Sequence, residues 1–381
     1  MANSPFKSVS IGILGGGQLG RMLVQEAINL NLRIAVLDPD PDAPCKTMVD
    51  RFVVGSFNDF DTVLAFGRSV DVLTVEIEHV NVDALEKLES EGKTVRPSSK
   101  VLRMVQDKGA QKEFYRQNGL PTAPFSLVED INGITTKKDS FPVMQKLRKG
   151  GYDGKGVQAL RTHEDLNKAF DAPSVLEAFV EMEKEVAVIV ARNPSGNICT
   201  YPAVEMKFNP DANLVESLFS PSTITSRQAE EASRIAERLA VALNLEGILA
   251  VELFITRTGD ILVNEIAPRP HNSGHATIEG NVTSQFEQHL RAILDLPLGN
   301  TSMITPSVMI NLLGAEGFSG EAVYIGMNEC LSLKGVHIHL YGKKITKPFR
   351  KMGHVTICSE RLDSALEIAE QVRTTLQVQS A

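Results

Sequence analysis

Hydrophobic and polar positions in the first hundred residues alternate between short apolar runs and segments with helical spacing. Residues 9–14, 33–37 and 71–75 are apolar runs of strand length, and residues 18–30 repeat apolar side chains at helical spacing. Strands that alternate with helices predict an α/β protein with a parallel sheet. Because ligands of open α/β sheets bind at the carboxyl ends of the strands, the polar residues that follow these runs are candidate site residues.

The pattern further along the chain predicts a long helix, a β-hairpin and a smaller α/β unit. Residues 100–118 have helical spacing and end at Gly119-Leu120-Pro121. Residues 247–256 and 261–266 alternate like two strands. A chain of 381 residues exceeds one ordinary core. We therefore expect three domains: a Rossmann-like domain over residues 1–105, a central domain over 106–300 with a lid at about 122–180, and a small C-terminal domain over 306–381.

The overall composition narrows the classes of partner. The formal net charge of −8 disfavours nucleic acid and anionic membranes. The four cysteines are scattered without a C-x-x-C pair, which indicates neither a disulfide framework nor a zinc site. We see no signal peptide and no apolar run of ~18 residues, the length that spans a membrane. The sequence thus predicts a soluble cytoplasmic protein without nucleic-acid or membrane partners.

The first candidate site is a glycine turn between a predicted strand and a predicted helix. Gly15, Gly17 and Gly20 spell G-x-G-x-x-G, and Asp38 follows Gly20 by 18 residues at the end of the next strand. Taken alone, this pattern fits a dinucleotide site. A turn that only packs helix against strand, or an anion site for another phosphorylated ligand, fits it as well.

A second glycine-rich segment, residues 150–156, contains four glycines in seven residues. Lys146, Arg148, Lys149 and Lys155 lie around and within it. Backbone N–H groups freed by glycine can surround an anion that lysines neutralise, so we expect phosphate contact here. The segment does not match G-x-x-x-x-G-K-[ST], which rules out a P-loop, and the alternative is an exposed hairpin tip.

The predicted hairpin carries two acidic residues at matched positions. A symmetric turn between Thr258 and Gly259 would pair residues whose numbers add up to 517, so that Glu252 would face Glu265. Facing carboxylates need a proton or a cation between them. Oxygen ligands favour Mg²⁺, and Asn264 offers another oxygen. The alternative is that both glutamates face solvent.

Two further polar segments are candidates for anion binding. The donor-rich string over residues 269–275 would hold a small oxyanion, unless its side chains only cap their own loop. The basic run over residues 343–351 would hold a substrate phosphate, although such runs are usually solvated faces.

These segments, in this order, resemble the ATP-grasp superfamily and, within it, the synthetases that carboxylate aminoimidazole ribonucleotide (AIR). The matching segments are GGGQLGR at residues 15–21, GYDGKG at 151–156, NEIAPRPHNSGH at 264–275 and RKMGH at 350–354. The third is highly specific, whereas the glycine turn alone is weak. The resemblance implies an N-terminal Rossmann-like (pre-ATP-grasp) domain, an ATP-grasp domain and a small C-terminal α/β domain. It assigns the glycine turn to AIR rather than to NAD.

The resemblance also implies a role for each matching residue. ATP contacts would come from Lys108, Lys146, Gly151, Tyr152, Asp153, Gly154, Lys155, Gly156, Glu177, Ala178, Phe179, Val180, Glu185, Asn264 and Glu265. Mg²⁺ would be held by Glu252 and Glu265. The AIR and bicarbonate sites would use Gln18, Leu19, Glu76, Glu78, Tyr152, Asp153, Lys155, Arg269, His271, Asn272, Ser273, Lys343 and Arg350. The catalytic group would comprise Asp153, Lys155, Arg269, His271 and Asn272, with Asp153 as general base.

The implied reaction is ATP- and bicarbonate-dependent carboxylation of AIR through carboxyphosphate, a step of purine biosynthesis. The resemblance further implies a homodimer whose product passes to a separate mutase. Val157 and Phe208 stand where many relatives have Gln and His near the nucleotide. The rival interpretations are another ATP-grasp ligase (a formate-using transformylase or a biotin carboxylase), an NAD-dependent dehydrogenase, and a non-catalytic nucleotide-binding regulator.

Overall fold

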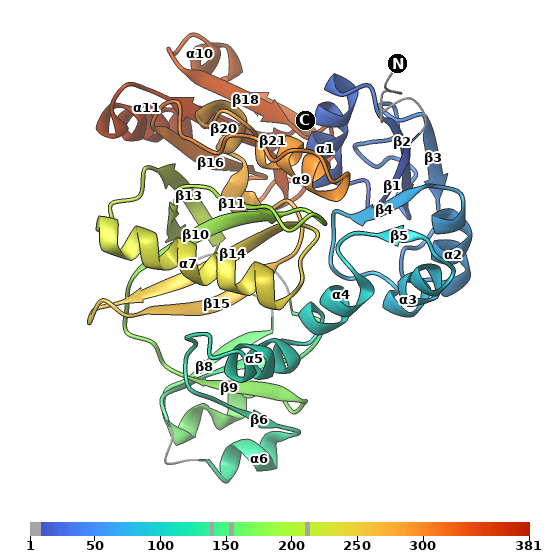
Figure 1. Cartoon of the computed structure of the whole chain (residues 1–381). Coiled ribbons are helices and arrows are strands. Elements are labelled where there is room, and N and C mark those ends of the chain that lie inside the picture. The colour runs from blue at the N-terminus through green and yellow to red at the C-terminus, as the bar shows by residue number, and fades with distance from the viewer. Residues whose placement is uncertain (1–8, 138–140, 152–155, 210–213) are drawn as a thin grey trace.

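The N-terminal region is a five-stranded parallel sheet in the order β3-β2-β1-β4-β5 (Figure 1). The structure, a computed structural model, describes residues 9–137, 141–151, 156–209 and 214–381. The strands are β1 (Ser10–Leu14), β2 (Arg33–Asp38), β3 (Arg51–Val54), β4 (Val72–Val75) and β5 (Thr94–Val95). All four pairings are parallel, as predicted. The carboxyl ends of β1 and β4 are adjacent, which brings the glycine turn next to the residues that follow β4.

Helices cover both faces of this sheet. The helices are α1 (Gln18–Asn29), α2 (Phe60–Arg68), α3 (Val82–Ser90) and α9 (Gln285–Ile293). Apolar side chains of α2 and α3 share one buried cluster with the strands. The other face packs against α1 and α9, and Phe286 and Leu290 of α9 are fully buried there. Because α9 belongs to the central region of the chain, the N-terminal sheet completes its core only with that region.

The long helix predicted over residues 100–118 is wrong, since two helices occupy this stretch. They are α4 (Ser99–Val105) and α5 (Lys108–Gln117). Asp107 has an extended backbone, and its carboxylate accepts the N–H groups of Gly109 and Ala110 at 2.8 and 3.2 Å. A side chain that satisfies the first N–H groups begins a new helix. The break places Lys108 at the first position of α5.

The central and C-terminal regions share one nine-stranded antiparallel sheet, in the order β15-β14-β10-β12-β13-β16-β20-β18, with β11 paired to β10. Its strands are β10 (Met182–Arg192), β11 (Ile198–Thr200), β12 (Val204–Asn209), β13 (Leu214–Ser220), β14 (Gly247–Thr256), β15 (Ile261–Ala267), β16 (Ser307–Leu313), β18 (Val336–Leu340) and β20 (Lys351–Cys358). The pairing of β13 with β16 joins the two regions. The C-terminal strands β16, β18 and β20 therefore extend the central sheet.

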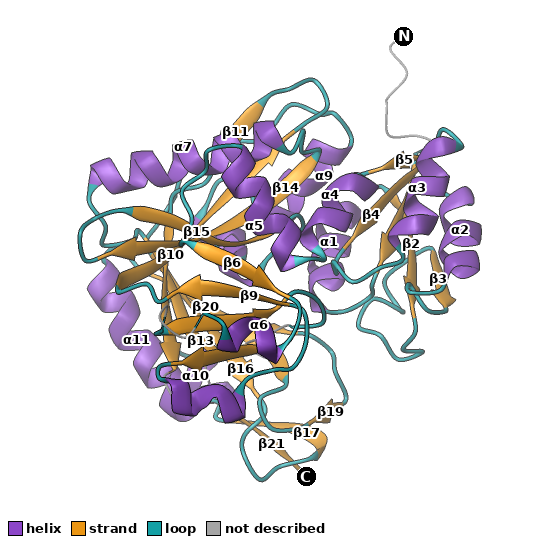
Figure 2. Cartoon of the chain, turned by 90° about the horizontal axis from the view of Figure 1, so that it is seen from below, coloured by secondary structure: helices purple, strands orange, loops and turns teal. Residues whose placement is uncertain are grey.

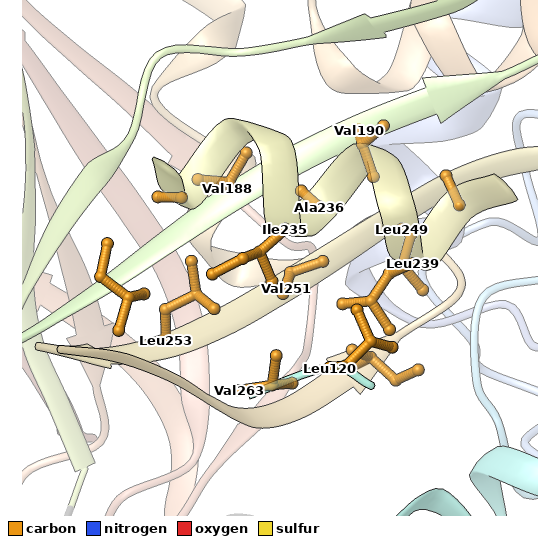
Figure 3. Packing of buried hydrophobic residues seen from close by; sticks show 14 of the residues in the cluster. Leu120, Val188, Val190, Ile235, Ala236, Leu239, Leu249, Val251, Leu253 and Val263 are labelled. Carbon is orange, nitrogen blue, oxygen red and sulfur yellow. The ribbon is translucent and has the colours of Figure 1, made fainter. Parts of the chain in front are cut away.

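Helix α7 (Ser226–Ala242) lies across β10, β14 and β15 (Figure 3). Its apolar residues recur every three or four positions, so one face is apolar. Ile235 and Leu239 on that face are buried against Val188, Val251 and Leu253 of the strands. This packing makes the β14–β15 hairpin part of the largest buried apolar cluster and fixes the positions of its polar residues.

A smaller four-stranded sheet in the order β6-β9-β7-β8 lies below the hairpin in Figure 1. It consists of β6 (Phe125–Val128), β7 (Val143–Leu147), β8 (Val157–Leu160) and β9 (Ser174–Ala178), with the short helices α6 (Ile131–Thr135) and η2 (His163–Lys168) beside it. We refer to these elements as the lid sheet. It has its own small core.

The C-terminal strands are covered by a helix and edged by a small three-stranded sheet, with the elements arranged as Figure 2 shows. These elements are α8 (Thr277–Gly280), β17 (Gly320–Ile325), α10 (Met327–Leu331), β19 (Ile345–Thr346), α11 (Leu362–Thr375) and β21 (Gln377–Ser380). Val372 of α11 is buried against β16 and β20. Within the described residues, no helix has the length and apolar character needed to cross a membrane.

Candidate active site

The predicted pairing of Glu252 with Glu265 across the β14–β15 hairpin is confirmed. The symmetric turn from which we derived it is wrong, because near the turn Ile255 pairs with Ile261 rather than with Leu262. A register shift between Glu252 and Leu253 compensates for that difference of one residue. The turn lies one residue away from the assumed symmetric position, and the register shift is also one residue. The pairing of Glu252 with Glu265 is therefore as predicted.

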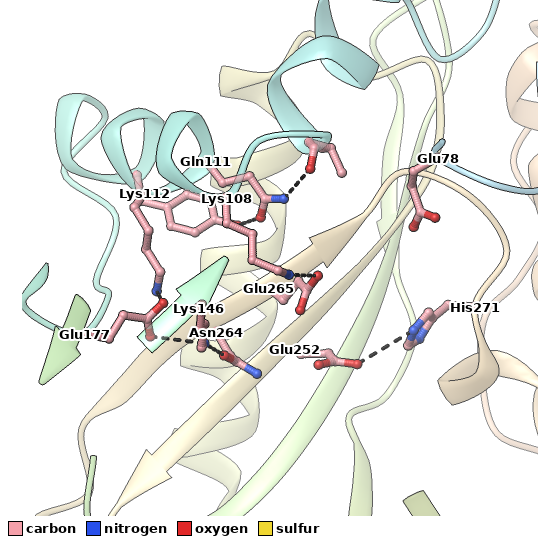
Figure 4. Close-up of polar contacts among 12 residues, drawn as sticks. Glu78, Lys108, Gln111, Lys112, Lys146, Glu177, Glu252, Asn264, Glu265 and His271 are labelled. Atoms are coloured by element: carbon pink, nitrogen blue, oxygen red, sulfur yellow. Dashed lines mark hydrogen bonds and ion pairs between the residues drawn. The ribbon is translucent and has the colours of Figure 1, made fainter. Parts of the chain in front are cut away.

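The register shift is a β-bulge, and it changes which side chains share a face. Val263 and Ile266 are buried, while the consecutive residues Asn264 and Glu265 are both partly exposed and interrupt the alternation of the strand. Two neighbouring residues of a bulge can present their side chains on the same side of a sheet. Three oxygen-bearing side chains, those of Glu252, Asn264 and Glu265, thereby lie near one another (Figure 4).

Two lysines predicted to bind phosphate converge on this hairpin from different elements (Figure 4). Lys108, at the start of α5, places its Nζ 2.5 Å from Oε1 of Glu265. Lys146, on β7 of the lid sheet, donates to Oδ1 of Asn264 at 2.9 Å and lies 3.1 Å from Oε2 of Glu177. Lys108 reaches the acidic strand because a new helix begins at that residue. Lys146 reaches it because β7 of the lid sheet lies beside the hairpin.

A third lysine, Lys112, belongs to the site and was not predicted from the sequence. It is 3% exposed and lies 3.2 Å from Oε1 of Glu177, while donating to Oγ1 of Thr122 at 2.7 Å. Burial lowers its pKa to about 8, although Glu177 favours the charged form. Lys112 follows Lys108 by four residues, so the helical repeat contained a signal that both lysines share a face. Glu177 thus pairs with two lysines, and its contact with ATP stays a prediction.

The acidic cluster carries more negative charge than its neighbours neutralise. Burial and the nearby Glu265 raise the pKa of Glu252 to about 7. Burial and the charge of Glu252 raise the pKa of Glu185 to about 8, and Asn264 lies 3.5 Å from this carboxylate. Burial also acts on Glu265, but the attraction of Lys108 and other cations outweighs it and lowers the pKa of that carboxyl.

These oxygens fit the ligand preference of Mg²⁺, which takes one or two protein carboxylates together with phosphate and water oxygens. A carboxylate whose pKa is raised by a facing carboxylate, as that of Glu252 is by Glu265, is stabilised in its charged form by a cation between the two. No group of three or more His, Cys, Asp or Glu residues in the described part of the chain has the geometry of a metal site. The hairpin is therefore suited to a metal that arrives with further oxygen ligands from a nucleotide.

The donor-rich string after β15 lies beside the same carboxylates. Arg269 lies 2.7 Å from Oε1 of Glu78, and its Nε is buried without a hydrogen-bond partner among the described residues. Nε2 of His271 lies 3.7 Å from Oε1 of Glu252. The backbone N–H of Ser273 donates to Nδ1 of His271 at 3.3 Å.

Two contacts of Nδ1 bear on the tautomer of His271: Oγ of Ser273 at 2.9 Å, which can donate or accept, and the N–H of Ser273, which can only donate. Burial and the charges of Arg269 and Lys351 hold the pKa of His271 well below its ordinary value, so the ring is neutral. Because Nδ1 accepts a hydrogen bond, the proton of the neutral ring is on Nε2. The ring therefore presents an N–H donor on the side of Glu252.

The glycine turn does not provide a free dinucleotide site. Glu76 accepts the N–H groups of Gly17 and Gly20 at 3.1 and 2.8 Å, so it already occupies the N-terminus of α1. Asp38 accepts the N–H groups of Gly16 and Asp40 at 2.6 and 2.8 Å. The position for a diphosphate and the acid for a ribose are thus both engaged within the protein, and the NAD interpretation does not fit.

The basic run near the C-terminus reaches the glycine turn. Lys343 donates to Oε1 of Gln18, the first residue of α1, at 2.9 Å and to the carbonyl of Lys351 at 2.8 Å. Arg350 instead donates to the carbonyl of Ile345 at 2.6 Å. Of the two predicted phosphate contacts, Lys343 lies at the end of α1, whereas Arg350 is engaged within its own segment.

The remaining predicted residues lie in the loops and strand ends around this cluster. The side chains of Asn272 and Leu19 are partly exposed, and Ser273 is buried. Phe179, after the end of β9, is 36% exposed beneath the guanidinium of Arg161 at 5.1 Å. Ala178 and Val180, its neighbours in sequence, are partly exposed, and the carbonyl of Gly156 accepts the N–H of Leu147 at 2.9 Å. Four predicted residues lie outside the described residues: Tyr152, Asp153, Gly154 and Lys155.

The lid sheet, the larger sheet with its acidic hairpin, and the lysines between them define an ATP-grasp protein. The family model of the ATP-grasp domain matches residues 113–286. The ribonucleotide synthetase preATP-grasp domain matches residues 8–106, and the phosphoribosylaminoimidazole carboxylase C-terminal domain matches residues 307–368. These matches confirm the predicted fold class.

The chain belongs to the N5-carboxyaminoimidazole ribonucleotide synthase family. It is 35% identical to the synthase of Bacillus subtilis over 363 residues, covering 94% of this chain and 93% of that protein. The crystal structure of the synthetase from Thermotoga maritima is 44% identical, with a TM-score of 0.91 and coverage of 98% and 100%.

Two other relatives are a ligand-bound structure and a longer protein. The structure of the Aspergillus clavatus synthase in complex with ADP and 5-aminoimidazole ribonucleotide is 32% identical, with a TM-score of 0.87 and coverage of 96% and 99%. The chloroplastic phosphoribosylaminoimidazole carboxylase of Vigna aconitifolia is 40% identical over 93% of this chain. The match covers only 65% of that longer protein.

Proposed function

We propose that this chain catalyses the carboxylation of AIR to N5-carboxyaminoimidazole ribonucleotide, using ATP and bicarbonate and releasing ADP and phosphate. The observation that carries the proposal is the pair Glu252 and Glu265, which face each other beside Lys108 and within reach of His271. This arrangement joins a site for a nucleotide's phosphates to a site for a small oxyanion, and a ligase that activates bicarbonate needs both.

The nucleotide would lie between the lid sheet and the hairpin. Lys108 and Lys146 would contact its phosphates, since both ammonium groups already point at the acidic strand. Glu177, Phe179 and Val180 would line the adenine, with Ala178 also in contact with ATP, and Glu185 would bind the ribose. Mg²⁺, held by Glu252 and Glu265 with Asn264 nearby, would neutralise charge on the phosphates.

The chemistry begins with a poor electrophile, because bicarbonate would have to expel hydroxide. In the first step, a bicarbonate oxygen attacks the γ-phosphorus of ATP, the bond to ADP breaks, and carboxyphosphate forms. Arg269, whose buried Nε has no hydrogen-bond partner among the described residues, and the neutral Nε2–H of His271 would hold this anion, while Asn272 and Ser273 would complete the loop around it.

In the second step, the exocyclic amine of AIR attacks the carboxyl carbon and phosphate leaves, or carboxyphosphate first breaks down to phosphate and CO₂ and the amine attacks that CO₂. The amine must also lose a proton, and Asp153 remains our proposal for the base. The glycine-rich residues 151–156 would exclude water from carboxyphosphate, which hydrolyses readily. AIR itself would lie at the glycine turn, contacted by Gln18, Glu76 or Glu78 and Tyr152, with Lys343 and Arg350 on its phosphate.

The assembly and location stay predictions. We propose a homodimer in the cytoplasm whose product is converted by a separate mutase. Light scattering of the purified chain would show a mass of twice 41.6 kDa. A mass of 41.6 kDa at micromolar concentration would contradict the dimer.

A product assay tests the function directly. The enzyme with ATP, AIR and ¹³C-bicarbonate should form one product heavier than AIR by one labelled carboxyl group, with one phosphate released per product. ATP turnover that ignores AIR would remove AIR as the acceptor. Carboxylation of biotin, or formyl transfer from formate, would assign the chain to one of the rival ATP-grasp ligases.

A further inference from the structure

The main chain of His271 is held by the side chain of a residue in another element, Gln285. Gln285 is the first residue of α9 and is fully buried. Its Oε1 accepts the N–H of His271 at 2.9 Å, and its Nε2 donates to the carbonyl of His271 at 2.7 Å. One side-chain amide therefore satisfies both polar groups of a single residue, as a neighbouring β-strand would.

The same amide has a further contact. Nε2 of Gln285 lies 3.4 Å from Nδ1 of His275. Both hydrogens of the amide nitrogen are thus engaged, and its oxygen is engaged as well. A carboxylate of the same length would offer only acceptors, so glutamate cannot make these contacts when it is ionised.

The short helical turn η3 (Asn272–Gly274) follows His271, and a second set of hydrogen bonds holds its last residue, Gly274. The N–H of Gln285 donates to Oγ1 of Thr277 at 2.8 Å, and that hydroxyl donates to the carbonyl of Gly274 at 2.6 Å. Gly274 packs so closely on Gln285 that no side chain fits there, since a Cβ would lie 2.3 Å from Oε1 of Gln285. The start and the end of the turn are both fixed to the first residue of α9.

We propose that Gln285 is a positioning residue for the oxyanion-binding loop. By fixing the peptide of His271, it sets the direction of the ring whose Nε2 lies 3.7 Å from Glu252. Gln285 itself contacts no substrate in this account, and the inference rests on the proposed function of His271. A displaced donor would weaken binding of bicarbonate while leaving the lysines and the hairpin that serve ATP unchanged.

The same helix provides a matched control. Gln288 is also fully buried, accepts the N–H of Gly299 at 2.7 Å and donates to its carbonyl at 3.0 Å. It makes the same two-point contact, but on a loop that contains no predicted site residue. Replacing either glutamine by leucine removes the same kind of buried hydrogen bonds, so the structural cost of the two changes should be similar.

The experiment compares Gln285→Leu, Gln285→Glu and Gln288→Leu by steady-state kinetics with each substrate varied in turn. We expect Gln285→Leu to raise the apparent KM for bicarbonate about tenfold or more, with the KM for ATP changed less than about twofold. Gln285→Glu should also raise the apparent KM for bicarbonate, and it provides the test if Gln285→Leu fails to fold. Gln288→Leu should leave the KM for bicarbonate within about twofold of the unmodified enzyme. Equal effects of the Gln285 and Gln288 changes, or an unchanged KM for bicarbonate in a folded Gln285 variant, would overturn the proposal.

A readout independent of activity separates this proposal from the proposed function. In ¹⁵N spectra of histidine-labelled protein, with His271 assigned from the peak that His271→Asn removes, the unmodified chain should show a neutral ring protonated at Nε2. Gln285→Leu or Gln285→Glu should shift or broaden that signal, and Gln288→Leu should not. If the unmodified chain did not carboxylate AIR, that result would count against the proposed function and not against the positioning role of Gln285. An unchanged His271 signal in both Gln285 variants would count against the positioning role.

Discussion

The carboxylates of Glu252 and Glu265 face each other because a bulge moves the register of the β14–β15 hairpin by one residue. Without the bulge, the pairing seen near the turn would place Glu252 opposite Asn264. Next to the bulge, Asn264 accepts a hydrogen bond from Lys146 and Glu265 pairs with Lys108. One irregularity in the sheet thereby brings together the oxygens that we propose hold the metal–nucleotide complex.

Glu265→Gln should reduce kcat/KM at least about a hundredfold, because it removes a charge that a bound metal and its phosphates need while keeping the size of the side chain. The measurement is phosphate release at saturating AIR and bicarbonate as the Mg²⁺ concentration is varied. Glu231→Gln is the control, since Glu231 makes an exposed pair with Arg234 on α7 at 2.7 Å. Retained Mg²⁺-dependent turnover in Glu265→Gln would exclude Glu265 from the metal site.

Adjacent lysines near the C-terminus should differ in their effect on AIR binding. Lys343→Ala should raise the apparent KM for AIR by about ten- to a hundredfold, the value of one charge-assisted hydrogen bond, because Lys343 lies against Gln18 at the glycine turn. Lys344 instead pairs with Asp42 at 3.1 Å and is largely exposed. Lys344→Ala should therefore change the KM for AIR less than about twofold. Equal effects of the two changes would indicate general electrostatic attraction rather than a specific phosphate contact.

The parts of the fold that local patterns determine were predicted from the sequence. The parallel N-terminal sheet follows from apolar runs that alternate with helical spacing. The strands β1, β2 and β4 lie within one residue of the predicted runs, whereas the edge strands β3 and β5 were not predicted. The facing glutamates were also predicted, although by a turn symmetry that the hairpin does not have. Periodicity fixes which residues share a face, but it does not reveal a bulge that needs the neighbouring strand to form.

Features that depend on distant contacts were not predictable in this way. Asp107 interrupts an apolar repeat that continues across it, and its pairing with Arg148 at 2.7 Å joins residues 41 positions apart. The C-terminal strands extend the central sheet through the pairing of β13 with β16, which no local pattern encodes. Lys112 and Gln285 were missed because their importance comes from buried partners rather than from a motif.

The packing of α7 on the sheet should be a major source of stability. Leu239 is fully buried between α7 and the strands, so Leu239→Ala should lower the free energy of unfolding by about 2–5 kcal/mol. Val241, on the same helix, is 59% exposed, and Val241→Ala should change the free energy of unfolding by less than about 0.5 kcal/mol. Urea denaturation monitored by circular dichroism checks both values. A similar loss in the two variants would contradict the arrangement in Figure 3.

The buried Lys112 should make stability depend on pH in a direction opposite to that of a simple surface ion pair. Its pKa falls from 10.5 to about 8 on folding, so between these values the unfolded chain binds a proton that the folded chain has lost. The free energy of unfolding should therefore rise with pH across this interval, by at most about 3 kcal/mol from this residue. Comparison with Lys112→Met isolates the contribution, because the other titrating groups are common to both chains.

The variant lacks the cost of burying the ammonium group, so its stability relative to the unmodified chain should be most favourable near pH 7.5 and decline toward pH 10. Urea denaturation of both proteins at half-unit intervals measures this difference directly. If the difference in free energy of unfolding stayed constant across the interval, Lys112 would titrate alike in the folded and unfolded chains. The pair it makes with Glu177 would then be more accessible to water than its 3% exposure indicates.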